Sequence, residues 1–126
     1  MNLVTPLNRV LGLGSAKSGS EHWWMQRVTA VALVVLGLWF AISLVTLDDF
    51  GYPTVVAWVQ RPLTSILLIL TVLATAYHSY LGVQVVIEDY VHTTTLKLAA
   101  LIASAFAHFG LGVAAVFAVL KLAFNP

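Results

Sequence analysis

The chain has 126 residues, of which 60% are hydrophobic and only 9% are charged. Soluble domains are about a quarter charged, so this composition excludes an ordinary soluble enzyme and predicts a small protein of the lipid bilayer. The net charge of +1 argues against nucleic acid as a partner, and the absence of cysteine excludes disulfides and thiolate chemistry.

The first 27 residues are predicted to form a polar segment at one membrane surface. Glycine and serine are frequent between residues 12 and 20, and Trp23 and Trp24 mark the headgroup region. The apolar stretch at residues 10–13 is too short for the core of a signal peptide, and Pro6 interrupts it. The lack of an arginine-rich presequence favours a bacterial inner membrane over a mitochondrial one.

Three uncharged runs follow, at residues 28–47, 63–87 and 98–120. A helix needs about 20 residues to cross a hydrocarbon core of roughly 30 Å, and each run is at least that long. Since lipid does not tolerate unpaired backbone groups, all three are predicted to be transmembrane helices. The expected fold class is therefore an all-α membrane protein with three spans, in a single membrane-anchor domain over residues 1–126.

Short connections join the predicted spans. Residues 48–62 contain a Gly-Tyr-Pro break and several aromatic residues and are predicted to form an interfacial loop, and residues 88–97 form the second link. Four lysine and arginine residues fall on the side of the N-terminus and two on the other side, so the positive-inside rule predicts a cytoplasmic N-terminus. No connection can hold a soluble catalytic domain, so any catalysis is expected to be shared with partner subunits.

His78 is the most unusual residue of the second run. It lies ten residues before Glu88, which places it about 15 Å below the predicted membrane boundary. An imidazole at this depth is costly, so it either hydrogen-bonds to a neighbouring helix or ligates a metal. Haem iron is the natural candidate, because the macrocycle is apolar and needs only axial nitrogen from the protein. Small residues share the helix face of His78 and suit either a flat cofactor or a closely packed helix: Thr71, Ala74, Thr75 and Gly82.

Three residues at the predicted boundaries are further candidates. Arg27 is either a positive-inside anchor or a cation for the carboxylates of a cofactor or for a quinone carbonyl. Asp89 follows His78 by 11 residues and falls on the same face if the helix continues. Asp89 and Tyr90 are either solvated residues at the water edge or, as a phenol beside a carboxylate, a pair that binds a quinone oxygen and relays protons.

The other histidines leave an alternative open. His108 lies in the middle of the third run, at a depth similar to that of His78, so the two could ligate one haem within this chain. His22 and His92 are interfacial, and His22 is also a candidate partner for a propionate.

The order His78-Ser-Tyr-Leu-Gly82, followed by Gln84 and then by Asp89 and Tyr90, resembles one family. It is similar to the small hydrophobic membrane anchor of succinate dehydrogenase (respiratory complex II), whose pattern is His-x-x-x-Gly-x-x-x-x-x-x-Asp-Tyr late in the second of three spans. Residues 21–30 also resemble the start of that family's first span, in particular in alphaproteobacterial members. With the number of spans and the length, the resemblance covers essentially the whole chain.

The resemblance implies a role for each of these residues. His78 would supply one axial ligand to the iron of haem b, and the other would come from the partner anchor, a cytochrome b556-type membrane subunit. Tyr90 would hydrogen-bond ubiquinone, with Asp89 as its acidic neighbour. Arg27 would lie close to the haem propionates, and His22 is near a histidine of similar role.

The resemblance thus implies a membrane anchor that tethers a flavoprotein subunit and an iron–sulfur subunit of succinate dehydrogenase. Electrons from succinate, an acid of the tricarboxylic acid cycle, would pass to ubiquinone in electron transport. Three alternatives stay open: a purely structural anchor in which His78 bonds to a neighbouring helix, a self-contained bis-histidine b-type cytochrome that also uses His108, and a small transporter or channel subunit. His108 has no counterpart in the family.

Overall fold

The computed structural model describes residues 16–124, with side chains from residue 19 onward. Within this range the secondary structure consists of helices, without strands. It contains three long helices and one short one, in the order α2 Ala16–Val45, α3 Tyr52–Val59, α4 Pro62–Tyr90 and α5 Thr94–Ala123. The three long helices are long and apolar enough to cross a membrane. The predicted all-α fold class with three spans is therefore confirmed.

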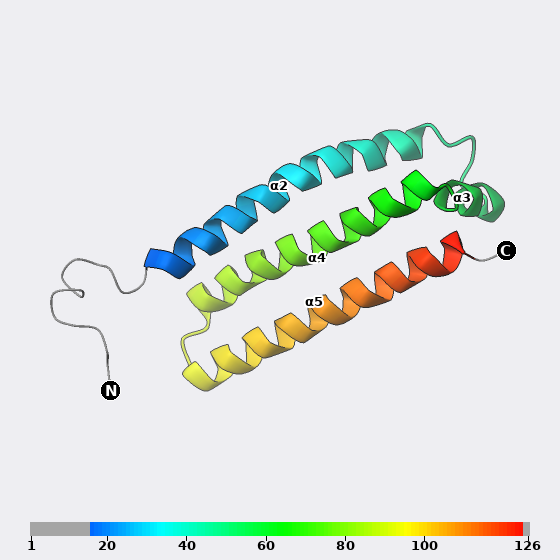
Figure 1. The fold of residues 1–126 in the computed structure, drawn as a ribbon. Helices are drawn as coiled ribbons and strands as arrows, with labels where there is room; N and C mark the ends of the chain where they lie inside the picture. Colours follow the sequence, from blue (N-terminus) through cyan, green and yellow to red (C-terminus); the bar gives the residue numbers. More distant parts are fainter. Residues whose placement is uncertain (1–15, 125–126) are drawn as a thin grey trace.

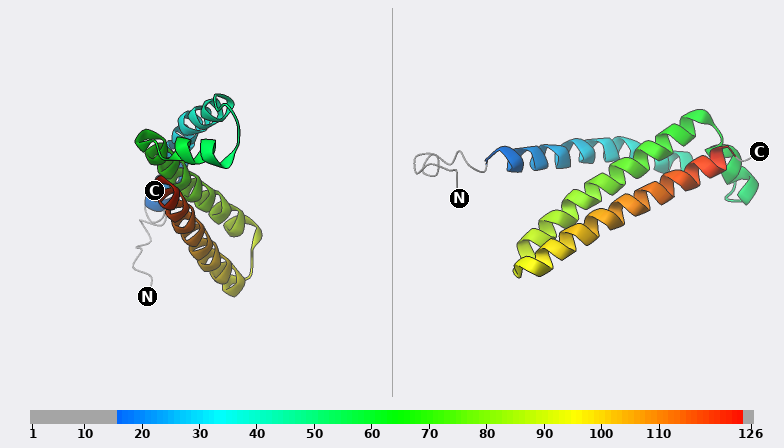
Figure 2. Two further views of the ribbon diagram at one scale, coloured as in Figure 1. Left: turned by 90° about the vertical axis from the view of Figure 1, so that its right-hand side faces the viewer. Right: turned by 60° about the horizontal axis from the view of Figure 1, so that its bottom comes forward.

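The helix α4 lies between the other two long helices (Figure 1). It packs against α2 and against α5, whereas α2 and α5 do not approach each other closely. A second view shows that α2 crosses α4 obliquely and that α5 runs alongside α4 (Figure 2). The described part of the chain is thus an open row of helices, in which no side chain is completely buried.

The long helices extend beyond the predicted spans. The helix α2 begins at Ala16 and not at residue 28, so the described part of the predicted polar segment is helical. Only residues 91–93 separate α4 from α5. Charged residues end a hydropathy run but not a helix, because a helix can project from the hydrocarbon into water. Lys97 shows this directly: its Nζ donates a hydrogen bond of 2.8 Å to the backbone oxygen of Glu88, one of the last carbonyls of α4.

The connection predicted as an interfacial loop contains the helix α3. Pro53 lies in the first turn of α3, where its missing N–H is not needed, so the Gly-Tyr-Pro sequence starts a helix. The turn before it is closed by Asp49, whose Oδ1 accepts a hydrogen bond of 2.6 Å from the backbone N–H of Gly51. A Cβ on Gly51 would lie only 2.8 Å from that oxygen, so the tight turn favours glycine.

The predicted alternation of the spans is also confirmed. The N-terminal end of α2 and the connection 91–93 lie at the same end of the long helices. The helix α3 and the C-terminal end of α5 lie at the opposite end (Figure 1). Arg27 and Lys97 therefore belong to one end, and Arg61 and Lys121 to the other. The signal-peptide prediction concerns residues 1–15, which lie outside the described part. The same is true of two positions used for the orientation, residue 9 and the side chain of residue 17.

Candidate functional site

His78 lies on the face of α4 that packs against α2. Its Nδ1 is 2.9 Å from Oγ1 of Thr29, and its Nε2 is 3.4 Å from the amide nitrogen of Gln26. Gly82 faces the same neighbour, since a Cβ built on it would lie 3.8 Å from the Gln26 amide nitrogen. The predicted face of small residues is thus in contact with α2 at Gly82, and the half-buried imidazole stands between the two helices.

Two polar atoms on this part of α2 are buried without a hydrogen-bond partner among the described residues: Nε2 of His22 and Oε1 of Gln26. His22, Gln26 and Thr29 are spaced as i, i+4 and i+7, so they share the face of α2 that meets α4. A buried polar atom without a partner costs about 1–3 kcal/mol. The sequence predicted His22 at the membrane interface; in the structure it is half-buried and shares a face of α2 with Gln26 and Thr29, the two contacts of His78.

Sequence reasoning missed Gln26 and Thr29 as site residues. Both lie on the helix opposite His78, and the periodicity of the second span carries no information about its neighbour. The signal that was present is the spacing of the polar side chains at positions 22, 26 and 29, which places all three on one face of the helix.

Arg27 lies on the other side of α2. It precedes Thr29 by two residues, which is a rotation of roughly 200° around the helix axis. The Arg27 side chain is exposed, and its guanidinium carbon lies 5.4 Å from the centre of the Trp23 ring, as a cation–π pair. The structure therefore does not bring Arg27 together with His78, but places it with an aromatic residue at the outer face of α2.

Asp89 and Tyr90 are the last two residues of α4, so the helix continues as far as the predicted shared face requires. Asp89 lies about three turns from His78 on the same side. Both side chains are exposed, with Tyr90 at 79% of its surface, and neither makes a hydrogen bond within the described part of the chain. At this end of α4, both side chains are accessible to another subunit or to a ligand.

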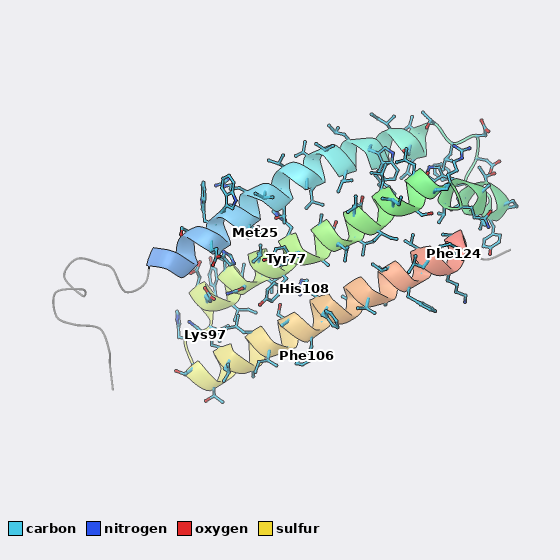
Figure 3. The ribbon with its side chains drawn as sticks, in the orientation of Figure 1. Met25, Tyr77, Lys97, Phe106, His108 and Phe124 are labelled. Atoms are coloured by element: carbon cyan, nitrogen blue, oxygen red, sulfur yellow. The ribbon has the colours of Figure 1, made fainter. Side chains whose placement is uncertain are left out.

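His108 lies between α4 and α5 (Figure 3). Its Nδ1 is 2.8 Å from the backbone oxygen of Ser104, and its Nε2 is 3.1 Å from Oγ of Ser79. Since the carbonyl only accepts, Nδ1 carries the proton and Nε2 accepts from the Ser79 hydroxyl. His78 bonds to α2 and His108 packs on the opposite side of α4, so the two imidazoles do not face a common space.

An apolar cavity of about 330 Å³ adjoins His108 between α4 and α5. Tyr77 and His108 line it, whereas Phe106 lies on the outward side of α5 (Figure 3). The two helices come close beside it, since a Cβ on Gly112 would lie 3.6 Å from the Cβ of Ala76. Small residues at this crossing allow the backbones to approach each other, as is usual between membrane helices.

The hydrogen bond between Ser79 and His108 should contribute modestly to stability. Ser79→Ala removes the donor, and we expect a loss of about 0.6 kcal/mol, with an upper bound near 1.7 kcal/mol, as for other bonds between membrane helices. Thermal unfolding of the purified complex in detergent measures it. Ser104→Ala is the comparison: it removes the 3.3 Å contact between the Ser104 hydroxyl and Nδ1 of His108 but leaves the shorter bond from Nδ1 to the Ser104 backbone oxygen, so we expect a smaller loss. A larger loss in Ser104→Ala than in Ser79→Ala would contradict the assigned bond.

Comparison with known proteins agrees with this architecture. Residues 1–119 match the family model described as succinate dehydrogenase/fumarate reductase transmembrane subunit. The succinate dehydrogenase hydrophobic membrane anchor subunit of Rickettsia bellii is 40% identical over 90 residues, which cover 71% of this chain and 72% of the relative. The protein of the same name from Paracoccus denitrificans is 33% identical over 122 residues, which cover 97% and 94%. This chain therefore belongs to the succinate dehydrogenase/fumarate reductase transmembrane subunit family, as a membrane anchor of succinate dehydrogenase.

Proposed function

We propose that this anchor supplies one axial ligand of haem b through His78 and part of a ubiquinone site through Tyr90 and Asp89. It pairs with a second anchor chain of the cytochrome b556 type and tethers the iron–sulfur and flavoprotein subunits to a bacterial inner membrane. The observation that carries the proposal is the state of the His78 ring, whose Nε2 has only a 3.4 Å contact, with Gln26, on a face of α2 that carries two buried atoms without partners among the described residues.

The residues around His78 fit a haem. A porphyrin needs an axial imidazole nitrogen, a face of small residues and polar groups for its propionates. Gly82 provides a position without a side chain beside His78, and His22 has a buried Nε2 that lacks a partner among the described residues. A bound haem would exchange single electrons at its iron. The chain's own part is to hold the group, to exclude water and to direct one nitrogen towards the iron.

Tyr90 and Asp89 suit the edge of a quinone site. The phenol O–H of Tyr90 can donate a hydrogen bond to a quinone carbonyl oxygen, and the carboxylate of Asp89 can accept and release a proton nearby. Reduction of a quinone to a quinol takes up two electrons and two protons. In the proposed complex the electrons come from the iron–sulfur subunit. Since Tyr90 is 79% exposed in this chain, other subunits would complete the site.

Isolation of the complex tests the assembly. A tag on this chain should recover a flavin-containing subunit, an iron–sulfur subunit and a second membrane anchor, with succinate:ubiquinone reductase activity and a b-type absorbance spectrum. Recovery of the subunits without a haem band would leave a purely structural anchor. The structure gives this alternative a specific basis, because the bond between His78 and Thr29 joins α4 to α2 without a cofactor.

The other two alternatives have less support. A bis-histidine cytochrome within this chain needs His78 and His108 on one haem, but they pack on opposite sides of α4. Reconstitution of haem by the isolated chain would revive it. A channel needs a continuous polar path, whereas in the described spans the two histidines make separate contacts, His78 with α2 and His108 with Ser79. Flux through liposomes that hold this chain alone would be needed to support that function.

The N-terminus is proposed to lie in the cytoplasm. The count of lysine and arginine residues supports this orientation, and so does the need for Tyr90 to face the same side as the electron-delivering subunits. Alkaline phosphatase, which is active only outside the cytoplasm, should therefore be active when it is fused after residue 126. It should be inactive when it replaces the chain beyond residue 92. The reverse pattern would contradict the orientation.

His22 should matter more than Arg27 for holding the haem. The two residues are five positions apart on α2, but His22 shares a face of α2 with the contacts of His78 and has a buried Nε2, whereas Arg27 lies with Trp23 on the outer face. We expect His22→Leu to lower the ratio of haem to flavin in the purified complex more than Arg27→Leu does. A larger loss in Arg27→Leu would show that the propionates reach the outer face of α2 and that the role implied for Arg27 holds.

A further inference from the structure

We propose that Thr29 is a positioning residue for the iron ligand: its hydroxyl oxygen holds the proton of His78 on Nδ1 and so keeps Nε2 available. The inference rests on the proposed function, because it assigns the residue that prepares His78 for haem b. It concerns α2, the helix that does not carry the ligand.

Thr29 is placed by bonds within its own helix. It is buried, with 8% of its surface exposed, and its Oγ1 lies 2.8 Å from the backbone oxygen of Met25 and 3.2 Å from that of Gln26. A threonine hydroxyl has one hydrogen, and a carbonyl oxygen can only accept. The hydrogen therefore points to these carbonyls, chiefly that of Met25, and the lone pairs of Oγ1 remain for another donor.

The remaining partner of Thr29 is the imidazole. Its Nδ1 lies 2.9 Å from Oγ1, so Nδ1 carries a proton and donates it. A neutral imidazole has one N–H, and Nε2 then carries a lone pair. If Thr29 instead donated to Nδ1, its oxygen and the Met25 carbonyl would face each other at 2.8 Å with no hydrogen between them. The arrangement of α2 thus selects the tautomer of His78.

This tautomer is the one that a haem ligand at Nε2 requires. The contact at that nitrogen is the Gln26 amide at 3.4 Å, which is long for a hydrogen bond. An iron at Nε2 would therefore replace a weak contact and leave the strong one at Nδ1 intact. Histidines that ligate metals usually donate their other N–H to an oxygen, which fixes the ring and makes the ligand more basic.

Thr29→Val tests this inference in the purified complex, because valine keeps the shape of the side chain and removes the acceptor. We expect haem to be retained about 10- to 100-fold less tightly, as for other losses of an outer-shell partner. The haem that remains should have a higher midpoint potential, since a less basic ligand stabilises ferric iron less, and altered electron paramagnetic resonance signals. Thr29→Ser keeps the hydroxyl and should restore all three readouts.

Thr46→Val is the control for the loss of a threonine back-bond. Thr46 directly follows α2, 17 residues after Thr29, and its Oγ1 donates to the backbone oxygen of Ser43 at 3.0 Å, with no bond to an imidazole. We expect a wild-type haem spectrum and potential in this variant. Equal changes in Thr46→Val and Thr29→Val would mean that the loss of a back-bond, and not the orientation of His78, causes the effect.

The outcomes separate this inference from the proposed function. If His78→Ala loses haem while Thr29→Val keeps the wild-type affinity, potential and resonance signals, the role of Thr29 is overturned and the haem stays. If the wild-type complex holds no haem, the role of Thr29 and the haem assignment are both overturned. Should the valine variant not assemble, Thr29→Ala and Thr29→Ser decide, since the inference requires loss in the first and retention in the second.

Discussion

His78→Ala should remove the b-type haem band from the purified complex. Alanine leaves no nitrogen for the iron, so the loss should exceed the roughly 10- to 100-fold drop in affinity that follows from losing an outer-shell partner. The measurement is a reduced-minus-oxidised absorbance spectrum, with haem expressed relative to flavin. The flavin content shows in the same sample whether the complex has assembled, which matters because the substitution also breaks the bond between His78 and Thr29.

The matched control is His108→Ala. His108 is of the same residue type, lies within the neighbouring span and has its own hydrogen bond to α4, through Ser79. Because it packs on the opposite side of α4, its loss should leave the haem band unchanged. An unchanged spectrum in His78→Ala would remove the cofactor assignment. A band lost only in His108→Ala would move the assignment to α5.

Tyr90→Phe should lower ubiquinone reduction by about tenfold or more while succinate oxidation by a soluble artificial acceptor continues. The substitution removes only the phenol O–H, and a hydrogen bond to a reacting oxygen is worth about 1.5–3 kcal/mol when the oxygen carries charge. Assembly should be unaffected, since Tyr90 is 79% exposed at the end of α4. The measured quantity is the ratio of the two activities in one preparation.

Tyr77→Phe controls for the loss of a phenol from the same helix. Tyr77 lines the apolar cavity between α4 and α5. It precedes Tyr90, the last residue of α4, by 13 residues, which is roughly 20 Å along the helix. We expect both of its activities to remain at the wild-type level. If Tyr90→Phe lowers the two activities equally, the residue acts through the attachment of the soluble subunits and not through the quinone.

The spans could be predicted from the sequence because lipid imposes a length and an apolar character on each of them. Their ends could not, since hydropathy reports where water begins and not where backbone hydrogen bonding stops. Lys97 illustrates this difference: it was placed in a link, yet it lies in α5 and bonds to the end of α4. The helix α3 could not be predicted for a related reason, because Gly-Tyr-Pro is typical of a break between helices, whereas here Pro53 lies in the first turn of a helix.

The candidate site divides in the same way. His78 and Gly82 could be found from depth and spacing on one helix, and the structure places both against α2. The contribution of α2 depends on which of its faces meets α4, and this is decided by tertiary packing. This packing brings Thr29 into contact with His78, and it places Arg27, two residues earlier, on the outer face of α2. Boundary position alone could not distinguish them.

The open row of helices has a consequence for how quickly the unassembled protein is degraded in a cell. The helices α2 and α5 lie on either side of α4 and apart from each other. The described part of the chain therefore has no enclosed core that would stabilise it by itself. Its persistence would depend on mass action with its neighbours, as in obligate oligomers. Copies made in excess of the other chains would be removed by proteolysis, so the abundance of this anchor would report how much of the complex has been built.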